Sequence, residues 1–225
     1  MQRSVQLKNP AGSGQTLRYR LMKRVLDLLV ATLVLLCLSP LFLVCALLVR
    51  RSSAGPVLFR QRRVGQHGRE FTCLKFRSMY SDADPAPHQA YVAAMIKGEA
   101  AGYGEGDERL YKLVDDPRVT PIGRWLRRTS LDELPQLWNV LRGEMSLVGP
   151  RPPIPYELEN YDARHLARLA VKPGITGLWQ VSGRSRTSFE DMVRLDLEYI
   201  QHPSILFDCL ILVRTIPAVV APLAA

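Results

Sequence analysis

The chain has 225 residues and a formal net charge of +9, from 30 lysines and arginines against 21 acidic residues. This length suits one domain with appendages, and the positive charge favours an anionic partner such as acidic lipid headgroups, phosphate-bearing molecules or nucleic acid. The four cysteines form no CxxC pair and the histidines are scattered, so neither a zinc site nor a disulfide framework is supported.

An uncharged apolar stretch covers residues 28–49 and carries Ser39-Pro40 near its middle. A straight helix of this length would be about 33 Å long, enough to cross the hydrocarbon core of a bilayer. Pro40 lacks a backbone N–H and its ring crowds the carbonyl of Leu36, so we expect the helix to bend there. We expect Ser39 to donate a hydrogen bond back to the carbonyl of Leu35 and to offset part of that loss.

Both flanks of this stretch are basic: residues 1–24 contain lysines and arginines and no acid, and Arg50-Arg51 follows it directly. Cytoplasmic flanks of membrane helices are the basic ones. The pattern therefore favours a re-entrant helix that turns at Ser39-Pro40 and leaves on the face where it entered. A kinked single span is the alternative, and Arg50-Arg51 argues against a signal-peptide cleavage site.

Downstream, the pattern predicts a mostly helical α+β domain. Strand-like runs over residues 57–62 and 71–76 flank a glycine-containing loop and predict a β-hairpin. Helices are expected over residues 80–101, 122–128, 134–141, 156–170 and 189–199, with Gly143 closing the third. The proline-rich residues 149–153 are incompatible with a helix or a central strand. Residues 174–183, which contain several glycines, suggest a loop and turns. The apolar tail, interrupted by Asp208, Arg214 and Pro217, suggests an interfacial helix.

The motif with the clearest chemistry is Ser130-Leu131-Asp132-Glu133-Leu134-Pro135-Gln136. Proline is comfortable only in the first turn of a helix, which predicts that Asp132 and Glu133 lie at a helix N-terminus. The helix dipole lowers carboxylate pKa values there. A capping box between Ser130 and Glu133, with no catalytic role, is the alternative.

Cations are dense around this acidic pair, namely Arg124, Arg127, Arg128, Arg142 and Arg151. Two carboxylates among guanidinium groups suit a divalent metal bound to a diphosphate, although any single arginine can equally be a solvated surface charge. Further on, Gly183-Arg184 and Arg186 follow a glycine-rich segment at residues 172–177. Backbone N–H groups in such turns can bind anions.

At these residues the chain resembles the bacterial monotopic phosphoglycosyl transferases, the sugar transferases that start exopolysaccharide and O-antigen assembly. The matching blocks are Phe59-Arg60-Gln61 with Arg63 and Gly65, Lys75-Phe76-Arg77-Ser78-Met79, the acidic motif above, residues 145–152, and residues 172–180 through Gly183-Arg184. A re-entrant helix broken at Ser-Pro is also a trait of that family.

The resemblance implies transfer of a sugar-1-phosphate, in particular a hexose-1-phosphate, from a UDP-sugar to polyprenyl (undecaprenyl) phosphate with release of UMP. It makes Asp132 the nucleophile of a covalent phosphosugar intermediate and a ligand of Mg²⁺, with Glu133 completing the dyad. It assigns substrate binding to the following residues: Lys75, Arg77, Arg127, Pro150, Arg151, Pro152 and Arg184.

The same resemblance implies a protein of the bacterial inner membrane with its catalytic domain on the cytoplasmic face. The expected organisation is a disordered basic leader (1–16), a re-entrant membrane helix (17–51), a catalytic domain (52–204) and an apolar interfacial tail (205–225). Membrane lipids are expected partners, nucleic acid is not, and the oligomeric state stays open. Two alternatives remain: a membrane-anchored basic module without catalysis, which binds acidic lipid or nucleic acid, and a conventional glycosyltransferase, which would release UDP.

Overall fold

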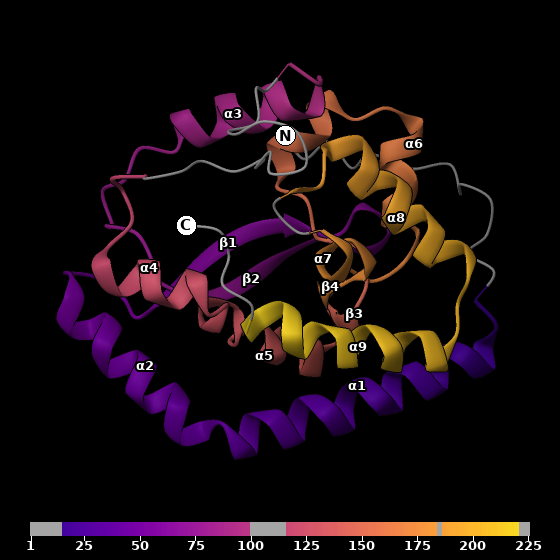
Figure 1. Cartoon of the computed structure of the whole chain (residues 1–225), viewed down its shortest axis with the longest axis horizontal. Helices are drawn as coiled ribbons and strands as arrows, with labels where there is room; N and C mark the ends of the chain where they lie inside the picture. Colours follow the sequence, from indigo (N-terminus) through magenta and orange to yellow (C-terminus); the bar gives the residue numbers. More distant parts are fainter. Residues whose placement is uncertain (1–14, 100–115, 184–185, 221–225) are drawn as a thin grey trace.

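The computed structural model describes residues 15–99, 116–183 and 186–220 (Figure 1). Along one side of the molecule run two helices, α1 (Leu17–Cys37) and α2 (Ser39–Ser52), which meet at a 64° bend. Among the described residues no single helix has the length and apolar character needed to cross a bilayer, whereas this bent pair taken together does by those two criteria. The predicted break at Ser39-Pro40 is confirmed.

Local chemistry explains where the two helices begin. The Thr16 side chain accepts a 3.2 Å hydrogen bond from the backbone N–H of Tyr19 and so caps α1. Pro40 lies in the first turn of α2, where its missing N–H leaves no helical hydrogen bond unmade. Ser39 Oγ donates to the carbonyl of Leu36 at 2.9 Å. The expected back-bond therefore forms, but to Leu36 and not to Leu35, because the bend falls directly at residue 38.

The predicted hairpin is confirmed as strands β1 (Leu58–Val64) and β2 (Glu70–Phe76), joined by a 3₁₀ turn at Gln66–Gly68. Its outer edge is covered by a single buried side chain. Asn139 accepts from the N–H of Leu74 at 3.1 Å and donates to the carbonyl of Thr72 at 2.7 Å. These two bonds satisfy one N–H and one carbonyl on the open edge of β2 and fix the hairpin against the helix that carries Asn139.

A second, parallel sheet pairs β3 (Ser146–Val148) with β4 (Gly174–Thr176). The prediction of loop and turn over residues 174–183 was wrong there, since β4 is followed by the short helix α7 (Leu178–Ser182). Strands of three residues are too short to show an alternating pattern. Gly174 is required at this pairing, because a Cβ there would lie 2.1 Å from the backbone nitrogen of Gly149.

Five predicted helices are present, with shifted ends: α3 (Ala86–Ile96), α4 (Pro121–Arg128), α5 (Gln136–Arg142), α8 (Phe189–Gln201) and α9 (Ile205–Val220). Gly143 ends α5 with a φ of 81°, as expected. The predicted continuous helix over residues 156–170 was wrong. It is divided into 3₁₀ turns at Pro155–Asn160 and Ala167–Ala170 on either side of α6 (Ala163–Leu166), because Asp162 and His165 form a capping box that starts a new helix.

Helix α1 is fixed to the rest of the fold by buried carboxylates. Asp27 accepts from Ser146 Oγ and from the N–H of Leu147, each at 3.0 Å, and so joins α1 to β3. Asp208 of α9 lies 3.1 Å from Lys23 Nζ and accepts from the hydroxyl of Tyr19 at 2.9 Å. Since both carboxylates are almost completely buried, these contacts determine how α1 lies against the domain.

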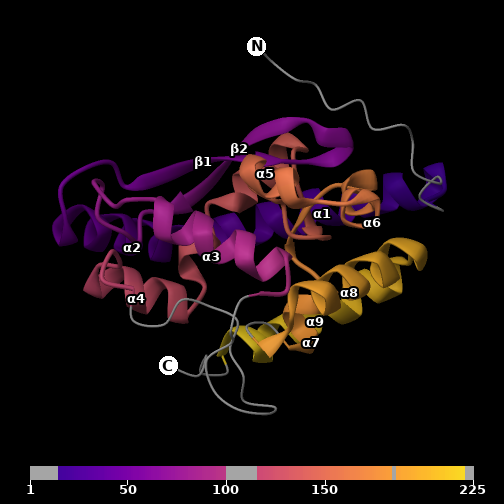
Figure 2. The same ribbon diagram turned by 90° about the horizontal axis from the view of Figure 1, so that it is seen from above.

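The opposite faces of these helices are apolar and exposed. On α1 and α2 they present, among others, Leu21, Leu29, Leu33, Leu36, Leu43 and Leu47. Helix α9 buries Asp208 and Ile211 but exposes Leu206, Val213 and Ile216. Seen from above, the hairpin and the α8–α9 pair lie on opposite sides of the α1–α2 line (Figure 2). The predicted leader falls mostly on residues 1–14, which lie outside the described part of the chain.

Candidate active site

The acidic pair lies in a 3₁₀ turn, Leu131–Glu133, which connects α4 to α5. The backbone of Ser130 enters this turn with a φ of 56°, in the left-handed region. Its side chain does not cap the turn, and the Glu133 side chain is bonded to another element of the fold. The capping-box alternative is therefore excluded, and both carboxylates are left for other contacts.

The partner of Glu133 is Lys75 on β2. Lys75 Nζ donates to Glu133 Oε1 at 2.6 Å, and the Glu133 side chain is 36% exposed. Burial acts to raise the pKa of Glu133, but the charge and hydrogen bond of Lys75, together with the charges of Arg151 and Arg63, lower it below its usual value. The hairpin thus brings the predicted residue Lys75 directly to the dyad and keeps Glu133 ionised.

Asp132 is 7% exposed. Burial raises its pKa to about 6, with Glu133 acting in the same direction and with Lys75 and Arg127 opposing it. The expectation of a lowered pKa was therefore wrong for this residue, because desolvation outweighs any dipole of α5, which begins only at Gln136. At neutral pH Asp132 is mainly ionised, but its charge is poorly stabilised by the protein.

Arg127, on the last turn of α4, is positioned by Ser78. Its Nε donates to Ser78 Oγ at 2.9 Å. The carbonyl of Ser78 accepts from the N–H of Thr120 at 3.1 Å. At Gly123 a Cβ would lie 1.9 Å from that carbonyl, so only glycine allows α4 to pack so closely. These contacts hold the Arg127 guanidinium in the neighbourhood of Asp132, whose pKa it lowers.

The loop that contains Pro150, Arg151 and Pro152 is fastened through its carbonyl groups. Arg63 Nη1 donates to the carbonyl of Pro152 at 2.7 Å, and Arg168 Nη2 reaches the carbonyl of Arg151 at 3.4 Å. The N–H of Gly174 donates to the carbonyl of Pro150 at 2.9 Å. These bonds all use backbone carbonyls, and the charge of the Arg151 side chain lowers the pKa of Glu133.

The match to a family model is with the bacterial sugar transferases and spans residues 18–222. The chain belongs to the bacterial sugar transferase family. It is 47% identical over 197 residues to the exopolysaccharide production protein ExoY of Sinorhizobium fredii, with 88% of this chain and 84% of that protein covered.

Two further relatives are longer proteins that match over part of their length. The undecaprenyl-phosphate galactose phosphotransferase of Salmonella typhimurium is 41% identical, with 87% of this chain and 40% of the relative covered. The UDP-glucose:undecaprenyl-phosphate glucose-1-phosphate transferase of Escherichia coli is 43% identical, with 88% and 40% covered. The chain is thus an enzyme of the family that the sequence motifs indicated, and a non-catalytic basic module is no longer a candidate.

In this sugar transferase Arg77 is engaged away from the dyad. Its side chain is 5% exposed, and it donates to the carbonyls of Pro56 at 2.6 Å, Ser53 at 2.7 Å and Val49 at 3.3 Å. These bonds tie the end of α2 to the hairpin, which is a structural role. Arg184 lies outside the described residues, so its predicted contact with phosphate stays a prediction.

Arg168 and Asp196 are two residues of the sugar transferase that sequence reasoning missed. Arg168 Nε donates to Asp196 Oδ2 at 2.8 Å, and both side chains are almost completely buried. Through Nη2 the same guanidinium donates to the carbonyl of Arg151 and so supports the loop there. The sequence did contain one signal, since Arg168 is a basic residue on the apolar side of the segment 156–170. Its partner Asp196 is 28 residues away, so no local sequence pattern could identify the pair.

Among the described residues no group of three histidine, cysteine or acidic side chains is arranged to hold a metal ion. The dyad nevertheless fits the usual mode of Mg²⁺ binding, in which one or two carboxylates share the ion with substrate phosphates and water. One oxygen of Glu133 is already bonded to Lys75. Asp132 is therefore the better candidate for the protein ligand.

Proposed function

We propose that this sugar transferase moves a sugar-1-phosphate from a UDP-sugar to polyprenyl (undecaprenyl) phosphate and releases UMP. The observation that carries the proposal is the arrangement of Asp132, a buried carboxylate of raised pKa beside Arg127 and the Lys75-bound Glu133. Two relatives support the acceptor and the transferred group, since their names specify undecaprenyl phosphate as acceptor, one with galactose phosphate and the other with glucose-1-phosphate.

In the first half-reaction an oxygen of Asp132 attacks the phosphorus that carries the sugar. A bond forms between that oxygen and phosphorus, the bond from phosphorus to the bridging oxygen of the diphosphate breaks, and its electron pair leaves with UMP. The burial of Asp132 favours the attack because the carboxylate is poorly stabilised in its ionised state. Arg127 stabilises the charge on the transferred phosphoryl group.

In the second half-reaction a phosphate oxygen of the polyprenyl acceptor attacks the same phosphorus, and the bond to Asp132 breaks. The carboxylate is regenerated and the product is a polyprenyl diphosphate sugar. Lys75 keeps Glu133 ionised and directed at the site throughout. When bound, Mg²⁺ supplies neutralisation of the diphosphate charge, with Asp132 as its protein ligand.

We also infer a position on the cytoplasmic face of the bacterial inner membrane, with α1 and α2 as a re-entrant segment. The exposed apolar faces of α1, α2 and α9 and the half-exposed Trp125 and Trp138 support contact with lipid. Basic residues on both sides of the bent pair support the same face for its two ends.

The test is an assay of purified protein with a panel of UDP-sugars and undecaprenyl phosphate, with detection of UMP. The covalent route predicts that UMP also forms without acceptor, in at most stoichiometric amount, together with a phosphosugar adduct on the peptide containing Asp132. Asp132→Asn should release none, whereas the exposed Asp82→Asn should behave as wild type. Release of UDP would indicate a conventional glycosyltransferase, and strict dependence of UMP on acceptor would indicate direct transfer.

A further inference from the structure

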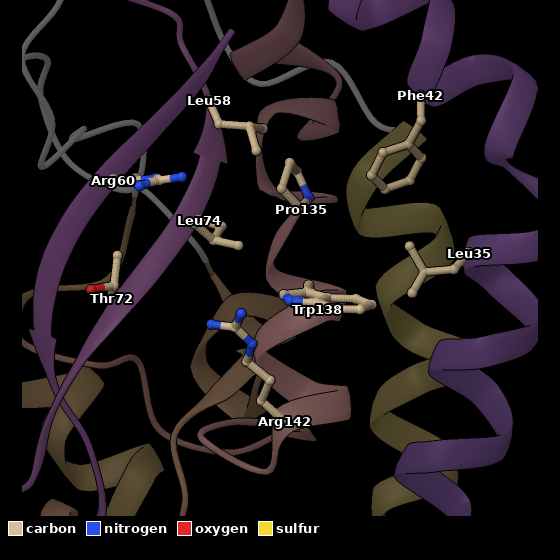
Figure 3. Close-up of a pocket in the computed structure, with 9 residues that line it drawn as sticks. All are labelled: Leu35, Phe42, Leu58, Arg60, Thr72, Leu74, Pro135, Trp138 and Arg142. Carbon is tan, nitrogen blue, oxygen red and sulfur yellow. The ribbon is translucent and has the colours of Figure 1, made fainter. Parts of the chain in front are cut away.

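A cavity of about 620 Å³ lies between the bent helix pair, the hairpin and α5. Its apolar wall comes from three parts of the chain, namely Leu35 and Phe42, Leu58 and Leu74, and Pro135 and Trp138. Leu35 and Phe42 stand on either side of the bend and close one side of the cavity (Figure 3). The volume is within the range of small-molecule sites, about 300–1,000 Å³.

Two arginines line the same cavity. Arg60 extends from β1, where it is paired with Leu74 of β2, and Arg142 extends from the last turn of α5. Both lie on the side opposite Leu35 and Phe42 (Figure 3). Neither forms an ion pair with any residue in the described part of the chain. The cavity therefore combines an apolar wall with two positive charges that form no ion pair with a described residue.

Arg142 has a further contact that holds it in place. Its guanidinium lies 5.7 Å from the centre of the Trp138 ring, within the range of a cation–π interaction. Pro135, at the N-cap of α5, and Trp138 and Arg142 within that helix share one face by their spacing. The tryptophan thus supplies apolar wall and at the same time directs a positive charge along it.

The cavity ends near the start of α5. Pro135 lines it and stands two residues after Glu133. Leu74 and Lys75 are successive residues of β2 and extend to opposite faces of the hairpin, so the cavity lies on the face away from the Lys75–Glu133 pair. On its other side the cavity is bounded by the inner face of the α1–α2 bend. The outer faces of these two helices expose leucines. A ligand in it would contact the proposed membrane segment and lie next to the beginning of α5.

We propose that this cavity is the loading site for the acceptor lipid, an inference that rests on the proposed function. The phosphate of a polyprenyl phosphate binds Arg60 and Arg142, whose planar guanidinium groups match phosphate oxygens. The isoprene units next to the phosphate lie against Leu35, Phe42 and Trp138, and the rest of the chain continues into the bilayer. The nucleotide donor is a poorer occupant, because most of this wall offers no polar partner for a sugar or a base.

The first test uses a polyprenyl phosphate with a photoreactive diazirine in an isoprene unit close to the phosphate, with full-length protein in nanodiscs. We expect adducts on peptides that contain Phe42 or Trp138, and their loss on competition with unlabelled polyprenyl phosphate. Adducts confined to the outer leucines, such as Leu29 and Leu33, would overturn the proposal. Equal competition by phosphatidylglycerol would overturn it as well, because the site would then be one for anionic lipids in general.

The second test removes the two charges. Arg60→Gln combined with Arg142→Gln should raise the KM for polyprenyl phosphate and weaken crosslinking by at least about tenfold, since charge-assisted hydrogen bonds are lost. The matched control is Arg62→Gln with Arg69→Gln, which removes two exposed charges from the same hairpin outside the cavity lining. An unchanged acceptor KM in the first double variant would overturn the proposal.

Stoichiometric release of UMP from the donor alone separates this inference from the function on which it rests. That release does not involve the acceptor, so it should be equal in wild type and in the Arg62→Gln/Arg69→Gln control. Absence of UMP from wild type would count against the proposed function, whatever the crosslinks show. Normal UMP release with crosslinks outside the cavity would count against the loading site alone.

Discussion

Lys75 Nζ lies 2.6 Å from Glu133 Oε1, and this bond distinguishes the two neighbouring carboxylates. Glu133 has its own cation and a lowered pKa. Asp132 has no ion pair with a described residue, and burial raises its pKa to about 6. The fold therefore gives adjacent acids of similar chemistry two different electrostatic states, of which the less stabilised is the better nucleophile.

We expect Asp132→Asn to abolish transfer and also to stabilise the fold. An unfolded aspartate titrates near pH 4 and the folded one at about 6. Above pH 6 the folded state therefore carries a charge that it disfavours, and below about pH 4 that penalty is absent. The free energy of unfolding should rise by roughly 1–3 kcal/mol at pH 7.5 and be unchanged at pH 4. Denaturant unfolding at both pH values tests this, with Asp82→Asn as control.

The rate of UMP release from donor alone should increase with pH through about 6, as Asp132 ionises. The positive charge of Lys75 opposes the raised pKa of Asp132, so Lys75→Met should shift this limb to higher pH. Lys97→Met, which removes an exposed charge, should leave the profile in place. An unshifted profile in Lys75→Met would contradict the assigned electrostatic role.

Ser78 is expected to act as a positioning residue through Arg127. Ser78→Ala deletes the acceptor of the 2.9 Å bond from Arg127 Nε, and turnover should fall by ~10- to 100-fold because the guanidinium loses its alignment. The KM for donor should change less than kcat, and thermal stability should fall only slightly. Ser81→Ala is the matched control, since Ser81 donates a comparable bond to a backbone carbonyl on an exposed site. Full activity in Ser78→Ala would mean that Arg127 needs no such support.

The buried pair Arg168–Asp196 should contribute to stability more than any exposed pair. Arg168→Met leaves the Asp196 carboxylate buried without its cation, which should cost ~3–5 kcal/mol of unfolding free energy. Arg168→Met with Asp196→Leu should recover most of that loss. Arg194→Met breaks a 3.4 Å pair whose side chains are 60% and 55% exposed, and should cost under ~1 kcal/mol. Equal losses from the two single variants would contradict the difference in burial.

The re-entrant position predicts that both ends of the helix pair react with an impermeant thiol reagent from the cytoplasmic side only. Suitable positions are Arg18→Cys and Ala54→Cys, both exposed, because Thr16 is needed as the cap of α1. The native Cys37 at the bend should be protected in membranes although its side chain is exposed in the isolated fold. Labelling of one end from the periplasm would indicate a single span.

Much of the fold was predictable because its signals are local. Proline at residue 40, glycine at residue 143 and the glycine loop of the hairpin each determine backbone geometry within a few residues. The second sheet was missed because β3 and β4 are short and distant in sequence. The helix over residues 156–170 was misjudged because its apolar periodicity outweighed the capping signal of Asp162.

The composition of the site was predictable to a similar extent. Of the motif residues, Lys75 bonds Glu133, and Arg127, which Ser78 positions, lowers the pKa of Asp132. The sign of the Asp132 pKa shift was not predictable, because it depends on desolvation by the surrounding fold and not on position along a helix. Arg168 escaped notice for the same reason, since its importance lies in a distant carboxylate.

The buried carboxylates Asp27 and Asp208 have a consequence for how substrates meet. They fasten α1 to β3 and to α9 through buried hydrogen bonds and an ion pair, so these three elements are held together as one unit. Under the proposed function no swinging arm is needed: a lipid acceptor would reach the site by lateral diffusion in the membrane plane, and a water-soluble donor would arrive from the aqueous side.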